Sequence, residues 1–252
     1  MLAWLQRARQ AIFFSALVLV VALSPSSYSR SYRPHLARHL VLGTLPNIGW
    51  FVLIGAAVCA VLIRIVLAST LSYGLSQYAL ELMVRLLVVE MMPLAVAIYV
   101  ALRCTLPFGE QVAHLRDPTL HQLRQEILPR VLAGMFAVVA LIAISGVATL
   151  LLIYLASHNV SAAGLASYTR LIGQVFDPSV TLIFSLKALS LAAVVALVPM
   201  LSNRVSGRVS GRVTAAEPRR PARNSSEELQ EMAQMFALVL VIEIVSLVAT
   251  YY

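Results

Sequence analysis

The sequence predicts an all-α integral membrane protein with an N-terminal interfacial helix followed by five transmembrane helices. Of its 252 residues, 60% are hydrophobic and 12% are charged, whereas soluble domains have about 25% charged residues. The apolar residues gather in runs of about 20, the length that an α-helix needs to cross the hydrocarbon core of a bilayer. None of these runs alternates polar with apolar residues, as the strands of a membrane barrel do.

The N-terminal segment has more than one interpretation. Arg7 and Arg9 precede an apolar stretch over residues 11–23, and Ala22-Leu23-Ser24 has the small residues of a signal-peptide cleavage site. Pro25 directly after it makes cleavage awkward, and the stretch is short for a span. We therefore expect an interfacial helix and a cytoplasmic linker over residues 1–42, with a signal peptide or a sixth span as alternatives.

Five apolar runs follow. They cover residues 45–68, 79–102, 131–155, 180–201 and 232–252. The third has no charged residue, the fourth contains only Lys187 and the fifth only Glu243. Ser225-Ser-Glu-Glu228 fits a capping box, so a helix is expected to begin there and continue into the fifth span.

The arginines predict the orientation of the spans. They cluster before the first span, between the second and third, and between the fourth and fifth, while residues 69–78 have no charge and Arg170 is the only strong base in 156–177. Because cytoplasmic loops are rich in Lys and Arg, loops at about 105–129 and 203–230 are predicted to be cytoplasmic and the C-terminus to lie outside. This placement explains the net charge of +8 better than binding of nucleic acid does. Residues 204–231 are read as a topology-setting flexible loop or as a contact for anionic lipid or a partner.

Six ionisable residues fall within or beside the spans: Arg64, Glu81, Arg85, Glu90, Lys187 and Glu243. A charge at the bilayer centre costs about 2.5–3.5 kcal/mol, so such residues are expected to face the bundle interior and to pair. Glu81 and Arg85 are spaced for an ion pair along one helix. Glu90 and Lys187 lie deeper, either in a headgroup-binding cavity or as a structural pair between helices. Pro93 is expected to kink its helix.

Motifs of catalysis are missing from the sequence. It has no GxxxxGK[ST] phosphate loop, no HExxH and no CxxC, and Cys59 and Cys104 form no metal-ligand pair. We expect no cofactor and no metal, and any ATP hydrolysis must take place on another chain.

The run from Glu90-Met-Met-Pro93 through Arg103 to Glu110 resembles the signature of the MlaE/YrbE permease family. That signature has a Glu three residues before a Pro, then an Arg, then a Glu. Tyr73 before the second span, Leu128-Pro-Arg130 before the third and Lys187 in the fourth resemble further family positions. The sequence departs from the family in having Val89-Glu-Met-Met-Pro93 where members have Arg-Glu-Leu-Gly-Pro.

The resemblance implies a multi-pass permease subunit, not an enzyme, in the bacterial inner membrane, with the permease domain over residues 43–252. Family members belong to ABC-type transporters that move phospholipid between bacterial membranes. The implied partners are a separate ABC ATPase subunit, a periplasmic MCE-domain protein and a second permease chain, identical or related, that completes a dimer. The remaining alternatives are a non-transporting membrane scaffold or an ion-coupled secondary transporter, although five unequal spans show no repeated halves.

Two sets of candidate site residues follow. The candidates for a lipid cavity are Tyr73, Leu82, Leu86, Glu90, Met92 and Lys187. The candidates for ATPase docking, all within residues 111–126, are His114, Arg116, Asp117, Pro118 and His121.

Overall fold

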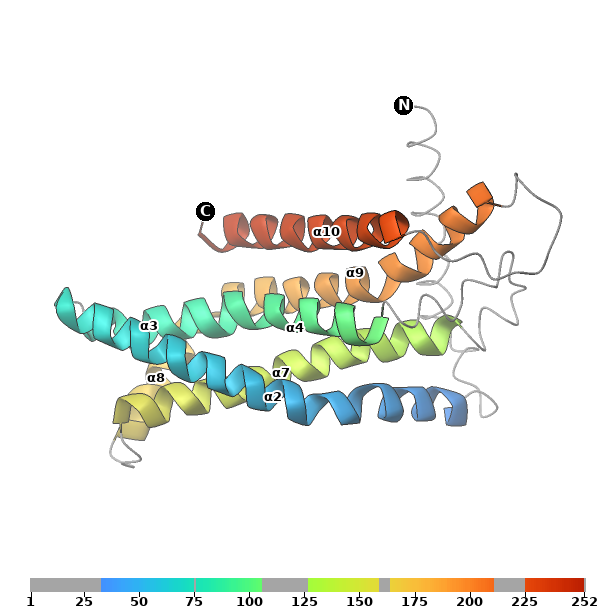
Figure 1. The fold of residues 1–252 in the computed structure, drawn as a ribbon. Helices are drawn as coiled ribbons and strands as arrows, with labels where there is room; N and C mark the ends of the chain where they lie inside the picture. The colour runs from blue at the N-terminus through green and yellow to red at the C-terminus, as the bar shows by residue number, and fades with distance from the viewer. Residues whose placement is uncertain (1–32, 75, 106–126, 159–163, 211–224, 252) are drawn as a thin grey trace. The chain divides into compact units, whose positions relative to one another are not determined.

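The structure, a computed structural model, describes residues 33–74, 76–105, 127–158, 164–210 and 225–251 (Figure 1). The expected interfacial helix over residues 11–23 lies outside these ranges, as do Glu110 and the five candidates for ATPase docking. All regular structure in the described ranges is helical, as predicted.

The described helices are α2 (Arg33–Ser72), α3 (Ser76–Met83), the π-helix η2 (Val84–Met91), α4 (Met92–Val100), the π-helix η3 (Ala101–Thr105), α7 (Leu128–His158), α8 (Leu165–Val175), α9 (Pro178–Ser210) and α10 (Ser225–Tyr251). Five stretches are long and apolar enough to cross a membrane: Gly49–Thr70, Tyr78–Arg103, Leu128–Ser157, Pro178–Pro199 and Met232–Thr250. The five predicted spans are therefore confirmed. The second one combines α3, η2, α4 and η3.

The chain divides into two compact units, and the long helices run from one into the other. Unit 1 contains Met1–Thr44, Val100–Ala137 and Ala192–Val239, and unit 2 contains Leu45–Tyr99, Val138–Leu191 and Leu240–Tyr252. In unit 1, small residues such as Ala133, Ala192 and Ala196 are buried, which is typical of helices that approach closely in a membrane. The ion cluster described below lies in unit 2.

The core of unit 2 is built from α2, α3, η2, α7 and α8. Its buried members are Ile63, Ala79, Met83, Val84, Leu87, Val88, Ile153, Tyr168 and Val175. Small and polar residues let the helices come close: Gly146 of α7 faces Val88, and the Thr149 hydroxyl lies 3.8 Å from Cys59 Sγ. Such contacts matter in a bilayer, because lipid is as apolar as leucine and burial of apolar surface alone does not hold helices together.

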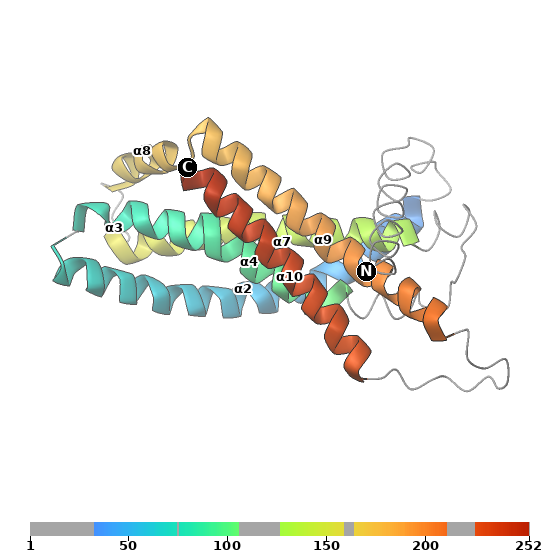
Figure 2. The same ribbon diagram turned by 90° about the horizontal axis from the view of Figure 1, so that it is seen from above.

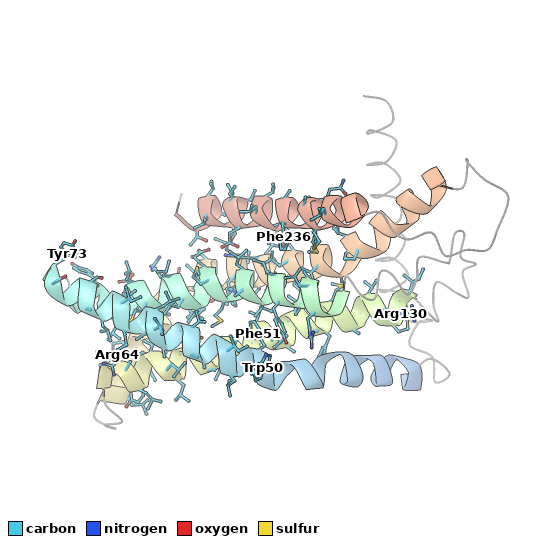
Figure 3. All side chains as sticks on the ribbon, viewed as in Figure 1. Trp50, Phe51, Arg64, Tyr73, Arg130 and Phe236 are labelled. Atoms are coloured by element: carbon cyan, nitrogen blue, oxygen red, sulfur yellow. The ribbon has the colours of Figure 1, made fainter. Side chains whose placement is uncertain are left out.

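The turn between α2 and α3 depends on a glycine. Gly74 has φ of +71°, a left-handed conformation that residues with a Cβ rarely adopt. The preceding Tyr73 N–H donates to the Ser69 carbonyl at 3.1 Å and closes the end of α2. Figure 3 shows the Tyr73 side chain at this end of α2, where it is 79% exposed.

Helix α8 is a short helix that packs beside α3 and η2 (Figures 1 and 2). The Tyr168 hydroxyl donates to the Leu150 carbonyl of α7 at 2.7 Å, and its ring lies 5.2 Å from that of Tyr154. Burial raises the pKa of Tyr168 to about 12. These contacts fix α8 at the end of unit 2 where α2 turns into α3.

Candidate functional site: a buried ion cluster

Lys187 lies at the centre of an ion cluster that joins three helices of unit 2. Its ammonium group on α9 donates to Glu90 Oε2 of η2 at 2.6 Å and to Glu243 Oε1 of α10 at 2.7 Å. A third bond goes to the Val89 carbonyl at 3.3 Å. The Lys187 side chain is 1% exposed, and the Glu90 and Glu243 side chains are 9% and 10% exposed.

The cluster has unused acceptors but no unused donor. A lysine ammonium has three N–H donors, and the three acceptors just described occupy all of them. Glu90 Oε1 and Glu243 Oε2 are buried and have no hydrogen-bond partner among the described residues. With both carboxylates ionised, one negative charge is uncompensated. The cluster can be completed by one proton on a carboxylate or by an additional group that donates hydrogen bonds or has a positive charge.

The local fold around Glu90 follows from Pro93. Proline has no N–H, so the carbonyl four residues earlier, that of Val89, lacks its α-helical donor. The chain forms the π-helix η2 at this point, with the Met92 N–H bonded to the Leu87 carbonyl five residues back. Lys187 then supplies a donor to Val89. The structure thus has a π-helix directly before the proline at which a kink was expected, and π-helices are frequently found at functional sites.

The structure brings some predicted residues together and separates others. Glu90 and Lys187, for which the sequence left a headgroup-binding cavity and a structural pair between helices open, form an ion pair between helices. The expected Glu81–Arg85 pair is confirmed, with Arg85 Nε 3.1 Å from Glu81 Oε1. Pro93 is buried in the first turn of α4, whereas Arg103 is exposed in η3.

The apolar candidates differ in their exposure. Leu82 and Leu86 are exposed one turn apart on span two, at 50% and 43%. Met92 is 5% exposed and packed inside, while its neighbour Met91 is 44% exposed. Tyr73 stands at the end of α2.

Glu243 is the cluster member that sequence reasoning missed. It was counted among the intramembrane charges but received no partner. The charge count contains no signal that Glu90 and Glu243 share Lys187, because the spans have three acids and three bases and Arg64 is a further possible partner. Arg64 does not compete for them in this structure, because its side chain is exposed on α2 (Figure 3).

The described ranges contain no group of three His, Cys, Asp or Glu side chains placed to hold a metal ion. The arrangement of five apolar helices with an ion cluster in their apolar stretches defines a multi-pass helical membrane protein. Intramembrane ionisable residues of this kind typically mark pathways for a transported substance.

Comparison with known families identifies the kind of membrane protein. The sequence matches the family described as Permease MlaE over residues 36–216, well over half of the chain. The chain belongs to the MlaE permease family and is a transport subunit rather than an enzyme. No curated protein matches it.

Proposed function

We propose that this chain is the permease subunit of an ABC-type transporter that moves phospholipid between bacterial membranes. The observation that carries the proposal is the buried Lys187–Glu90–Glu243 cluster inside a chain of the MlaE permease family. A separate ATPase supplies energy, an MCE-domain protein receives or delivers the lipid, and a second permease chain completes a dimer. The chain resides in the inner membrane with its N-terminus in the cytoplasm and its C-terminus in the periplasm, an orientation supported by the arginine bias.

We propose that the lipid headgroup binds at the ion cluster, where it contacts Glu90 and Lys187. Tyr73 stands at the rim, and Leu82 and Leu86 offer exposed apolar wall. Met92 joins the wall only when span two moves, because its side chain is buried in this structure.

The hydrogen bonds of the cluster constrain what a headgroup can do there. Because all three Lys187 donors are in use, a phosphate group binds Lys187 only by displacing Glu90, Glu243 or the Val89 carbonyl. A displaced carboxylate releases the helix that bears it, η2 or α10. Exchange of partners at Lys187 therefore links occupancy of the site to helix movement.

Docking of the ATPase is assigned to the segment at residues 111–126 with His114, Arg116, Asp117, Pro118 and His121, beginning just after the family-motif residue Glu110. If deletion of residues 114–121 leaves ATPase co-purification unchanged in an inserted chain, docking lies elsewhere, for example at residues 204–223.

The test is reconstitution of the chain with its ATPase and MCE-domain partner, followed by transfer of labelled phospholipid between vesicles. ATP-dependent transfer is expected for the wild type, and Glu90→Gln should slow it while the chain remains folded. Leu186→Met, a change at the exposed neighbour of Lys187, is the matched control and should leave transfer unchanged. Transfer driven by a proton gradient without the ATPase would overturn the proposal in favour of an ion-coupled transporter.

A further inference from the structure

A second polar site lies in unit 2 away from the ion cluster. A pocket of about 420 Å³ opens between α3 and α8 and is lined by Tyr78, Glu81, Leu171, Gln174 and Val175. Its volume falls within the range of small-ligand sites. Leu171 and Val175 provide apolar lining, while a carboxylate, an amide and a phenol provide polar groups.

The charged pair at this pocket has unused hydrogen-bonding capacity of both kinds. Glu81 lines the pocket and uses Oε1 to accept from Arg85 Nε at 3.1 Å. Glu81 Oε2 and the two Arg85 Nη groups have no hydrogen-bond partner among the described residues. The two side chains are 45% and 35% exposed, so a ligand can reach them without breaking the pair. Lys187, by contrast, is fully used and buried.

The pocket lies where the headgroups of a bilayer are expected. Tyr78 is the first residue of the second apolar span, and Pro178, the first of the fourth, follows shortly after α8. Tyrosine is enriched at this boundary between water and membrane. Tyr78, Leu82 and Leu86 follow one another at intervals of four residues and are 57%, 50% and 43% exposed. They form an apolar stripe that leads from the pocket into the membrane.

We propose that the pocket holds the headgroup of a phospholipid with a primary amine, in which an ammonium and a phosphate lie side by side. The ammonium donates to Glu81 Oε2 and the Gln174 amide oxygen, and the phosphate accepts from the Arg85 Nη groups. An acyl chain follows the stripe of Tyr78, Leu82 and Leu86. The proposal rests on the proposed function and deepens it, because it names the substrate class and the place where lipid enters or leaves.

The chemistry of the pocket discriminates between headgroups. A quaternary choline ammonium has no N–H to donate to Glu81, and a glycerol headgroup has no positive charge. A glycerol headgroup can donate O–H bonds to Glu81 without balancing its charge, and choline balances the charge without donating a bond, so each matches the Glu81 side only in part. A headgroup with a primary amine satisfies both sides.

The experiment uses photo-crosslinking of the full chain in vesicles. A benzophenone amino acid replaces Leu82, which lies on the stripe but not in the pocket lining, and in a control chain it replaces Leu182, which is equally apolar and 66% exposed. The vesicles contain equal amounts of phosphatidylethanolamine, phosphatidylcholine and phosphatidylglycerol. Mass spectrometry of the crosslinked protein should show phosphatidylethanolamine captured several-fold more than the other lipids at position 82, and no selectivity at position 182.

Variants test whether the Glu81–Arg85 pair causes the selectivity between headgroups. Glu81→Gln should abolish the preference, and the double change Glu81→Gln with Arg85→Gln should also lower total capture at position 82 without leaving a lone charge. Arg170→Gln, which removes an exposed charge of α8 outside the pocket lining, should change nothing.

Equal capture of the three lipids at position 82, or selectivity that survives Glu81→Gln, would overturn the assignment. Capture of a segment of the MCE-domain partner in place of lipid would overturn it too, since the pocket would then be a protein-docking site. The crosslinking does not depend on transport. Selective capture in a chain that fails ATP-driven transfer would refute the proposed function but support this headgroup site. ATP-driven transfer without selective capture would support the proposed function but refute this headgroup site.

Discussion

Lys187 holds two carboxylates that would otherwise stand alone in the membrane interior. Lys187→Met keeps an apolar stem of similar length but leaves Glu90 and Glu243 without their cation. Breaking a buried ion pair by removing one partner costs about 3–5 kcal/mol. We therefore expect Lys187→Met to lower the midpoint of thermal unfolding of the purified chain in mild detergent more than any exposed substitution does.

Restoring neutrality should reverse this loss. The triple variant Lys187→Met, Glu90→Gln, Glu243→Gln contains no ion in the cluster and should recover most of the stability, because the three changes are strongly coupled. Leu186→Met serves as the control beside it. If the triple variant were no more stable than Lys187→Met alone, the two glutamates would not be held by Lys187 in the folded chain.

Sequence reasoning at the residue scale succeeded where partners are fixed by local spacing or depth. Glu81 and Arg85 pair because four residues separate them on one helix, and Glu90 meets Lys187 because both lie deep in their spans. It failed to pair Glu243, because the face that α10 turns inward depends on packing between helices. Met92, a candidate for the wall of a lipid cavity, is buried in this structure, while Met91 is exposed. A π-helix turns less per residue than an α-helix, so a face counted at α-helical spacing shifts after η2.

The element that contains Glu90 is the π-helix η2, and we attribute its form to the missing N–H of Pro93. Pro93→Ala restores an N–H that can bond the Val89 carbonyl in the α-helical pattern. The segment Val84–Met91 should then approach an α-helix, which turns Glu90 away from Lys187. We expect slower amide hydrogen exchange over this segment, because the new bonds have better geometry, together with slower lipid transfer.

The control for this change is Pro199→Ala. Pro199 is also a proline inside a helix, α9, but it belongs to unit 1. Its replacement should slow exchange around residue 199 and leave transfer unaltered. Unchanged exchange over residues 84–91 in Pro93→Ala would show that the π-helix has another cause.

Helix α8 is fixed to unit 2 by the neutral hydroxyl of Tyr168. Its pKa is raised by burial to about 12, above the usual value of about 10. The stabilisation from this residue is therefore complete below about pH 10 and is lost as the pH rises through about 12. Tyr168→Phe should cost about 1 kcal/mol at neutral pH, the usual contribution of one hydrogen bond.

The measurement is thermal unfolding of the wild type and Tyr168→Phe between about pH 8 and about pH 12. The difference in stability between the two chains should shrink above about pH 10. Tyr73→Phe, at a tyrosine that is 79% exposed, should show no comparable effect. A difference that stays constant over the whole range would mean that the Tyr168 hydroxyl does not hold α8.

The helix ends show what sequence signals can and cannot define. Helix α10 begins at Ser225, where the capping box predicted a helix start. Helix α9, however, continues to Ser210, beyond the predicted end of the fourth span at residue 201, so the segment 204–231 is not a loop throughout. Helix α8 was not predicted, because its 11 residues lie in what reads as a polar connection between two spans.

At the scale of the whole molecule, the arginines of the sequence predict the orientation in the membrane. Since cytoplasmic loops hold the excess of Lys and Arg, the α2–α3 turn and the segment before α8 should face the outside, while the end of α9 should face the cytoplasm. In a chain whose Cys59 and Cys104 are replaced, single cysteines at positions 76 and 161 should react with a membrane-impermeant thiol reagent added to sealed cells. A single cysteine at position 210 should react only after the membrane is permeabilised, which also serves as the control that each site is reactive. Reaction of position 210 in sealed cells would contradict the five-span orientation. The loop between the second and third spans would then lie on the side of the membrane without ATP, so the proposal that the ATPase docks there would also be wrong.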